Sequence, residues 1–406
     1  MNSIFKQGLY GLKENQNLKI KIMKKILLFI FFSQLTISQN QWMSKSISEE
    51  PIFETKQLFF GERMPNIVVS TDGSIIASYG KTKFMVRRSE DGGNTWSPTI
   101  KVADGIHGGG LTVDEKSGDI IAFIEQEHPP SKLITYRSRD NGKSWKFSQI
   151  KILPDKNGKI PSMHMNEHGI TLLRGKYRGR LIRPTRYYNA KNSSERKLMY
   201  KSKKMWEGQF SNAIYSDDGG YNWSTSNPFP ANGTGEAAIV ELNDGSLYYN
   251  SRRHFYNDGN NHRMRLIASS TDGGQTWDDI YISDELPDGP KNSDYGLMAG
   301  LDRLPYKEQD ILIFSNVDSK NERENGMIWM SFDSGKTWPL KKSIDQGRFK
   351  YSSLAIGREN TPSEGFIYLL YEFGDFQNDY AGAKIAKFNL SWLFHGKDID
   401  QYLKLL

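Results

Sequence analysis

The chain has 406 residues and no cysteine, which excludes disulfides, thiolate metal sites and a cysteine nucleophile. Residues 1–38 carry six lysines and one glutamate, so +5 of the formal charge of +7 is local to the N-terminus. The remaining +2 gives no case for nucleic acid binding, while 12% aromatic residues and 37 glycines are typical of a turn-rich all-β protein.

The N-terminus has the pattern of a secretory signal. The basic start Met23–Lys25 is followed by the apolar run Ile26–Phe32 and by small residues at Thr36 and Ser38. The run is too short to span a membrane. We therefore predict that residues 1–38 are an extension and signal peptide with the true start at Met23, and that the mature protein is secreted or periplasmic. A membrane-anchoring N-terminus is the alternative.

Short strands separated by turns are predicted for the rest of the chain. Residues 67–69 and 74–78, joined by the turn Thr71-Asp72-Gly73, have the pattern of a hairpin. The same pattern recurs at 120–124, 181–183, 237–242 with 246–250, 311–315 and 366–371. No long amphipathic helix is expected, and the polar, basic stretch 189–206 predicts a long loop. Residues 39–406 thus form a single all-β domain in this interpretation.

One motif recurs five times. Its copies are Ser89–Trp96 (SEDGGNTW), Ser138–Trp145 (SRDNGKSW), Ser216–Trp223 (SDDGGYNW), Ser270–Trp277 (STDGGQTW) and Ser331–Trp338 (SFDSGKTW). In such a motif Ser and Asp side chains hydrogen-bond the backbone just ahead, Gly supplies a positive φ and Trp packs as an apolar plug. Each copy follows a strand-like run, so each marks one β-hairpin of a repeated unit.

The copies start 49, 78, 54 and 61 residues apart. Periods of this size predict a β-propeller with four-stranded blades. We predict six blades, or seven if the longest interval contains one more. The motif resembles the Asp-box, or BNR repeat, of sialidases. Because this turn also occurs in propellers that are not enzymes, function depends on other residues.

Three arginines extend the resemblance to sialidases across about residues 60–375. Arg63 lies in ERMP, which resembles the R-I-P segment of that family. Arg252 ends GTGEAAIVELNDGSLYYNSR, and Arg323 lies shortly before the last repeat. Guanidinium groups bind carboxylates through paired hydrogen bonds. The resemblance, which includes the bacterial exo-α-sialidases of glycoside hydrolase family 33, implies that these arginines bind the carboxylate of an acidic sugar.

Tyr351 (in KYSSLAI), Glu236 (in GTGEAAIV) and Glu372 (in LLYEFG) complete the resemblance. It implies that Tyr351 is the nucleophile, that Glu236 is its base and that Glu372 steadies Arg63. A neutral phenol suits a sugar whose anomeric carbon bears a carboxylate, which would repel an anionic nucleophile. A phenol with its ordinary pKa of about 10 is a weak nucleophile, so a neighbouring base is needed.

The sequence departs from the family at the proton donor. Sialidases carry an Asp acid/base between the first arginine and the first repeat, but the only carboxylic acid in that interval here is Asp72, in a turn. Such an acid typically contributes about 10²–10⁴ in rate. His107 and His168 are candidate replacements, and Glu125, Glu127 and His128 form another polar cluster.

Three functions remain open from the sequence. The first is an exo-glycosidase of the sialidase type that hydrolyses terminal acidic sugars. The second is a lyase or hydrolase of uronic-acid polysaccharide, in which a basic run contacts the anionic chain: Arg174, Lys176, Arg178, Arg180, Arg183 and Arg186, with Tyr187 and Tyr188 after it. The third is a propeller that binds acidic glycans without turnover. We predict a monomer with an acidic glycan as its partner, no cofactor and no catalytic metal.

Overall fold

Short strands joined by tight turns make up almost all of the regular structure. The computed structural model describes residues 41–107, 109–188, 190–202, 208–254, 263–289, 296–306, 309–375 and 379–395. The predicted signal peptide lies outside these residues. The described helices are α2 (Gln41–Ser48), α3 (Ser193–Lys201) and α4 (Leu390–Phe394).

The strands pair into five sheets. The first contains β2 (Asn66–Val69), β3 (Ile75–Tyr79), β4 (Lys83–Ser89) and β5 (Ile100–Asp104). The second contains β6 (Ile106–His107), β7 (Thr112–Val113), β8 (Ile120–Glu125), β9 (Leu133–Ser138) and β10 (Lys146–Phe147). The third contains β11 (Lys151–Ile152), β12 (Ile170–Thr171), β13 (Leu181–Tyr187), β14 (Phe210–Ser216) and β15 (Asn222–Thr225). The fourth contains β16 (Thr234–Glu241), β17 (Leu247–Arg253), β18 (Met264–Ser270) and β19 (Asp278–Pro287).

The fifth sheet has seven strands in the order β1-β25-β24-β23-β22-β21-β20. Its members are β1 (Phe53–Phe60), β20 (Gly300–Arg303), β21 (Leu312–Val317), β22 (Glu324–Ser331), β23 (Leu340–Ile356), β24 (Ile367–Phe373) and β25 (Gly382–Phe388). The N-terminal half of the 17-residue β23 pairs with β22 and its C-terminal half pairs with β24.

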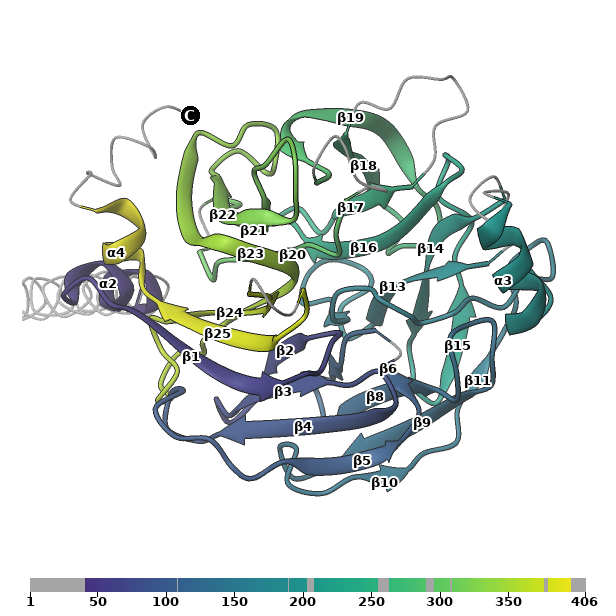
Figure 1. Ribbon diagram of the computed structural model, residues 1–406, viewed down its shortest axis with the longest axis horizontal. Helices are drawn as coiled ribbons and strands as arrows, with labels where there is room; N and C mark the ends of the chain where they lie inside the picture. The colour runs from purple at the N-terminus through teal and green to yellow at the C-terminus, as the bar shows by residue number, and fades with distance from the viewer. Residues whose placement is uncertain are drawn as a thin grey trace, which may run out of the picture.

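The sheets are arranged around the middle of the molecule, with β2, β6, β13, β16 and β20 toward the centre (Figure 1). This arrangement confirms the predicted all-β propeller. Because β23 joins two groups of four strands into one sheet, strand pairing alone gives five sheets. The number of six blades stays a prediction. Division of the fifth sheet at β23 into two blades would give that number.

The repeated motif forms the predicted turn, between the third and fourth strands of a sheet. In the first copy Ser89 Oγ donates to Asp91 Oδ1 (2.8 Å) and the Gly93 amide donates to Ser89 Oγ (2.8 Å). The amide of Thr95 donates to Asp91 Oδ1 (2.9 Å), and Trp96 Nε1 donates to the Gly93 carbonyl (3.1 Å). The turn is therefore bonded internally, and its carboxylate has a structural task.

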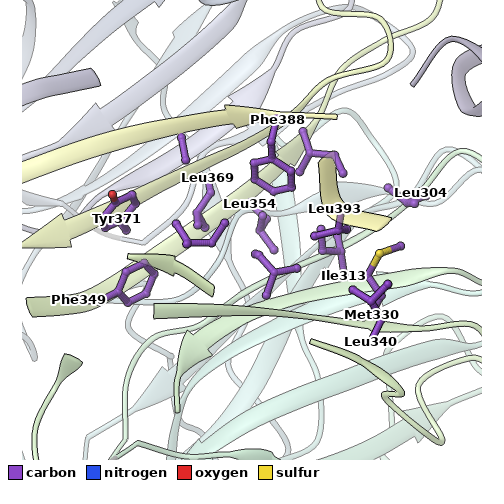
Figure 2. Close-up of a cluster of buried hydrophobic side chains, with 14 of the residues drawn as sticks. Leu304, Ile313, Met330, Leu340, Phe349, Leu354, Leu369, Tyr371, Phe388 and Leu393 are labelled. Atoms are coloured by element: carbon purple, nitrogen blue, oxygen red, sulfur yellow. The ribbon is translucent and has the colours of Figure 1, made fainter. Parts of the chain in front are cut away.

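The first strand of the chain completes the last sheet. β1 pairs antiparallel with β25, so segments from the two ends of the described chain lie side by side (Figure 1). Phe59 on β1 is buried and stacks on Tyr79 of β3 at 3.5 Å between ring centroids. On the last sheet, Leu354 of β23, Leu369 of β24 and Phe388 of β25 pack in one apolar cluster (Figure 2). The pairing of β1 with β25 thus extends the sheet that contains β23 and β24, the strands of Tyr351 and Glu372.

The loop predicted over residues 189–206 contains the helix α3. Asn192 caps it, because its side chain accepts the amide of Glu195 at 2.9 Å. The Glu195 carboxylate in turn accepts the amide of Lys191 (2.6 Å). The sequence NSSE over 192–195 is a helix-start signature of the capping-box kind, which outweighed the polar composition.

Candidate active site

A cavity of about 340 Å³ contains most of the predicted catalytic residues. Its lining residues come from segments far apart in the chain: Arg63, Met64, His128, His164, Met165, Arg186, Tyr188, Arg196, Tyr200, Glu236, Arg252, His254, Arg323 and Tyr351. Its size is at the lower end for ligand pockets. Of the described residues that line it, five are arginines and one, Glu236, is a carboxylic acid.

Tyr351, Glu236 and Arg252 form a connected group. The Tyr351 hydroxyl donates to Glu236 Oε1 at 2.9 Å, and Arg252 Nη1 lies 2.5 Å from Glu236 Oε2 and 3.4 Å from the Tyr351 hydroxyl. A register shift lies at each of the first two residues: in β16 between Thr234 and Ala237, around Glu236, and in β23 between Phe349 and Ser352, around Tyr351. Bulges commonly redirect a side chain next to an active site.

Arg63 and Arg323 approach the same tyrosine from other segments. The guanidinium carbons of Arg63 and Arg323 lie 5.3 and 5.7 Å from the centre of the Tyr351 ring. Glu372 on β24 is fully buried and accepts Arg63 Nε (3.2 Å), Arg63 Nη2 (3.3 Å) and the amide of Met64 (2.8 Å). The structure thus brings together the three arginines, the tyrosine and both glutamates that the sequence analysis singled out.

The protonation states of Glu236 and Tyr351 suit a base and a nucleophile. Burial would raise the pKa of Glu236, but Arg252, Arg186 and the hydrogen bonds outweigh it and hold that pKa below its ordinary value. Burial, followed by the negative Glu236, raises the pKa of the Tyr351 hydroxyl. At neutral pH the pair is therefore a carboxylate that accepts a hydrogen bond from a neutral phenol.

The structure does not bring His168 into this cavity. Its ring is buried, with Nε2 3.1 Å from the Leu354 carbonyl and Nδ1 3.3 Å from the Gly169 carbonyl, and it lines a different hollow. The backbone of His107 pairs with Ile124 in the second sheet, whereas its side chain lies outside the described residues. As a candidate proton donor, His168 is therefore wrongly placed, because it faces backbone carbonyls.

The sequence analysis named His128 only in a polar cluster and Tyr188 only with the basic run, and it did not name His164. His128 and His164 face each other with ring centroids 4.5 Å apart, and Tyr188 meets His128 edge-on at 5.7 Å. Burial, then the positive charges of Arg196 and Arg186, lower the pKa of His128 to about 3. This imidazole is neutral at physiological pH, so it lacks the acidic proton of an imidazolium.

Strand periodicity would have found two of these residues. His254 follows Arg252 by two positions, and Tyr188 follows Arg186 by two. Because side chains two positions apart in a strand lie on the same face, each pair is expected to lie on the same side. The position of His164 depends instead on a long-range contact. Glu125 on β8 accepts Ser162 Oγ (2.7 Å) and the Met163 amide (2.9 Å), which fixes the adjacent loop.

The basic run proposed to contact a polysaccharide does not form one surface at the site. Arg174 pairs with Glu241 at 3.1 Å, Arg180 pairs with Asp217 at 2.8 Å, and Arg183 is buried over Phe123. A larger cavity of about 930 Å³ is lined by Lys176, Tyr177, Arg178 and Arg180, with none of the predicted catalytic residues. From this run, only Arg186 and the following Tyr188 reach the candidate site.

Two further findings concern metals and membranes. Within the described part of the chain, no group of three or more His, Cys, Asp or Glu side chains is arranged to bind a metal ion. None of the described helices is long and apolar enough to cross a membrane.

Comparison with known proteins identifies relatives among sialidases. A sialidase of Micromonospora viridifaciens is 28% identical over 389 residues, covering 85% of this chain and 55% of that protein. A sialidase of Bacteroides fragilis is 26% identical over 365 residues, covering 76% and 59%. An anhydrosialidase of Macrobdella decora is 29% identical over 289 residues, covering 68% and 32%. The chain therefore spans between about a third and three fifths of the length of these relatives.

Solved structures share the fold. The microbial sialidase Hz136 from a Hadza source matches with a TM-score of 0.61 and 23% identity, covering 82% of this chain and 66% of that one. The intramolecular trans-sialidase of Ruminococcus gnavus matches with a TM-score of 0.61 and 18% identity, covering 82% and 95%. The model of the BNR repeat-like domain family matches residues 79–369. The chain therefore belongs to the BNR repeat-like domain family, within the sialidase and BNR β-propeller superfamily.

Proposed function

We propose that this protein is a secreted exo-glycosidase of the sialidase type that removes a terminal acidic sugar. The hydrogen bond of 2.9 Å from Tyr351 to Glu236, in a cavity lined by Arg63, Arg252 and Arg323, carries the proposal. A buried tyrosine in contact with a carboxylate and surrounded by guanidinium groups matches the requirements of an activated phenol that attacks an anionic sugar.

In the proposed reaction the three arginines bind the substrate carboxylate. The Tyr351 oxygen forms a bond to the anomeric carbon as Glu236 takes the phenolic proton, and the bond from that carbon to the leaving group breaks. Water then attacks the anomeric carbon and breaks its bond to the Tyr351 oxygen, and the phenolate recovers its proton from Glu236. The proton that the water loses goes to solvent and balances the leaving group, which departed as an anion. The raised pKa of Tyr351 and the lowered pKa of Glu236 mean that this proton moves only as the new bond forms.

The leaving group also needs a proton. Of the described residues that line the cavity, Glu236 is the sole carboxylic acid, and it is ionised. The proposal therefore favours substrates whose leaving group departs with little help from an acid.

The test is turnover of a 4-methylumbelliferyl sialoside by residues 39–406, because its leaving group is a stabilised phenolate. We expect fluorophore release by the wild type and loss of kcat in Tyr351→Phe with a small change in KM. Tyr371→Phe is the control, because this buried tyrosine on the adjacent strand bonds Asp345 and does not line the cavity. Equal kcat in wild type and Tyr351→Phe would refute the assignment.

A second candidate is β-elimination on a uronic-acid polysaccharide. His128 and Tyr188, 5.7 Å apart between ring centroids and beside arginines that can neutralise a uronate, are the observation for it, whereas the pKa of about 3 makes His128 a weak base and counts against it. An unsaturated product with ultraviolet absorbance would establish this reaction, and hydrolysis products without that absorbance would exclude it. If the protein retains acidic glycans but turns over neither class, it is a binding propeller.

A further inference from the structure

The cavity contains more positive charge than one carboxylate can balance. Five arginines line it, against the lining Glu236 and the Glu372 that backs Arg63. The proposed function uses three of the arginines, which leaves Arg186 and Arg196. Since a surplus of positive charge away from bulk water is costly, such a site favours the binding of further anions.

Arg186, Tyr188 and Arg196 form one wall, which we call the second wall. Arg186 and Tyr188 come from the end of β13 and beyond it, and Arg196 comes from α3. Arg186 is 3% and Tyr188 7% exposed. Among the described residues, the buried Nε atoms of both arginines and the Tyr188 hydroxyl have no hydrogen-bond partner. Buried donors in native proteins are almost always satisfied, so three together point to a missing acceptor.

The groups already near the second wall contact Arg186 through Nη1 and leave its Nε without an acceptor. Arg186 Nη1 lies 3.9 Å from Glu236 Oε1, which is an ion-pair distance but too long for a hydrogen bond. His254 Nε2 lies 3.5 Å from Arg186 Nη1, and burial and the surrounding arginines lower the pKa of His254. Burial and nearby arginines also lower the pKa of His128, which is neutral as well. For both histidines burial is the larger cause and the nearby arginines are the second.

We propose that Arg186, Arg196 and Tyr188 bind a second anionic group of the substrate, a carboxylate or a sulfate. The preferred glycan then carries two acidic groups close together: one at Arg63, Arg252 and Arg323, and the other at the second wall. This inference rests on the proposed function for the place of the first carboxylate. Guanidinium and phenol donors suit carboxylate and sulfate oxygens, because charged hydrogen bonds are the stronger kind. The second group is carried either by the same sugar or by the neighbouring one.

The first test uses inorganic sulfate as the probe, titrated calorimetrically at constant ionic strength with chloride. We expect Arg196→Gln to weaken one sulfate site of the wild type about tenfold or more, through loss of a charged hydrogen bond. Lys197→Gln is the matched control, because this exposed lysine is next on the same helix and does not line the cavity. Arg196→Lys, which keeps the charge, should restore part of the affinity, and thermal melting checks that each variant folds.

Unchanged sulfate binding in Arg196→Gln, or no sulfate binding by the wild type, would overturn the inference. Arg323→Gln separates it from the proposed function. Arg323→Gln should keep the sulfate site that Arg196→Gln weakens, and it should lose a different sulfate site. If Arg323→Gln changes nothing while Arg196→Gln does, the carboxylate clamp is wrong and the second wall stands.

The second test identifies the source of the second group. An array presents glycans with one acidic group, with two on one sugar, or with one on each of two adjacent sugars. We expect one of the doubly acidic classes to be retained more strongly than the singly acidic class. The more strongly retained of the two doubly acidic classes shows which sugar carries the second acidic group. Equal retention of singly and doubly acidic glycans would overturn the inference.

Discussion

The position of one proton, shared between Tyr351 and Glu236, decides the chemistry at the residue scale. Glu236 accepts the phenolic hydrogen bond while Arg252 and Arg186 keep it ionised. We expect Glu236→Gln to reduce kcat on the 4-methylumbelliferyl sialoside by about 10²–10⁴, because an amide of the same shape cannot take the proton. Glu364→Gln, a buried glutamate outside the cavity, is the control. An unchanged kcat in Glu236→Gln would show that the proton goes elsewhere.

The same assignments fix the pH profile. Glu236 has a pKa below its ordinary 4.5, so it stays deprotonated from neutral pH down to that value and is protonated only below it. The Tyr351 pKa is raised above 10, and that of His128 is lowered to about 3. We expect kcat/KM to stay flat between pH 7 and 4.5 and to fall below it. A limb near the ordinary pKa of histidine, about 6.5, would instead assign an essential proton to an imidazole. Recovery of activity on return to pH 7 controls for unfolding.

The sequence located the side chains at matching family positions, namely the three arginines, Tyr351, Glu236 and Glu372. It named Arg186 and Tyr188 but did not place them with Arg196 in the second wall, for physical reasons. Arg186 was visible but was grouped with five neighbours that turn out to form structural ion pairs or to lie elsewhere. Arg196 depends on a helix predicted as a loop, and His164 depends on a contact with Glu125, 39 positions earlier, that no local pattern encodes.

The repeated turn is the feature that matters at the element scale. Hydrogen bonds from Thr95 and Ser89 overcome the effect of burial and lower the pKa of Asp91 from 3.8 to about 2. We expect Asp91→Ala to lose about 1–2 kcal/mol, because several turn bonds vanish, and Tm to fall by a few degrees. Asp278→Ala, at an exposed strand position after another turn, should leave Tm unchanged.

The pH dependence of this loss has a definite sign. Because the folded pKa is the lower one, the contribution of Asp91 is complete above 3.8 and disappears as the pH falls toward 2. The Tm values of Asp91→Ala and wild type should therefore converge in acid. A difference in Tm that persists undiminished at pH 2 would contradict this account of the turn.

Most elements were predictable because their signals are local. Strands such as β2, β8 and β24 follow from alternating or continuous apolar runs bounded by turn residues, and the motif marks the hairpins. The sharing of β23 between two groups of strands was not predictable, since a continuous 17-residue strand depends on which neighbours pair with each half.

The ring is closed by the pairing of β1 with β25 at the scale of the whole molecule. Phe59 of β1 is buried against Tyr79, whereas the next residue, Phe60, is 76% exposed. We expect Phe59→Ala to reduce the free energy of unfolding by about 3–5 kcal/mol, and Phe60→Ala to change it by no more than about 0.5 kcal/mol. Urea denaturation measures both, and equal midpoints would show that β1 adds nothing to closure.

The central claim is that Tyr351 forms a covalent bond to an acidic sugar. The direct measurement is peptide mass mapping after incubation with a fluorinated sialosyl fluoride, whose ring fluorine slows hydrolysis of the glycosyl-enzyme. The account predicts one added sugar on the peptide that contains Tyr351, and none in Tyr351→Phe. An adduct on another residue, or no adduct from an enzyme that turns over the umbelliferyl substrate, would contradict it.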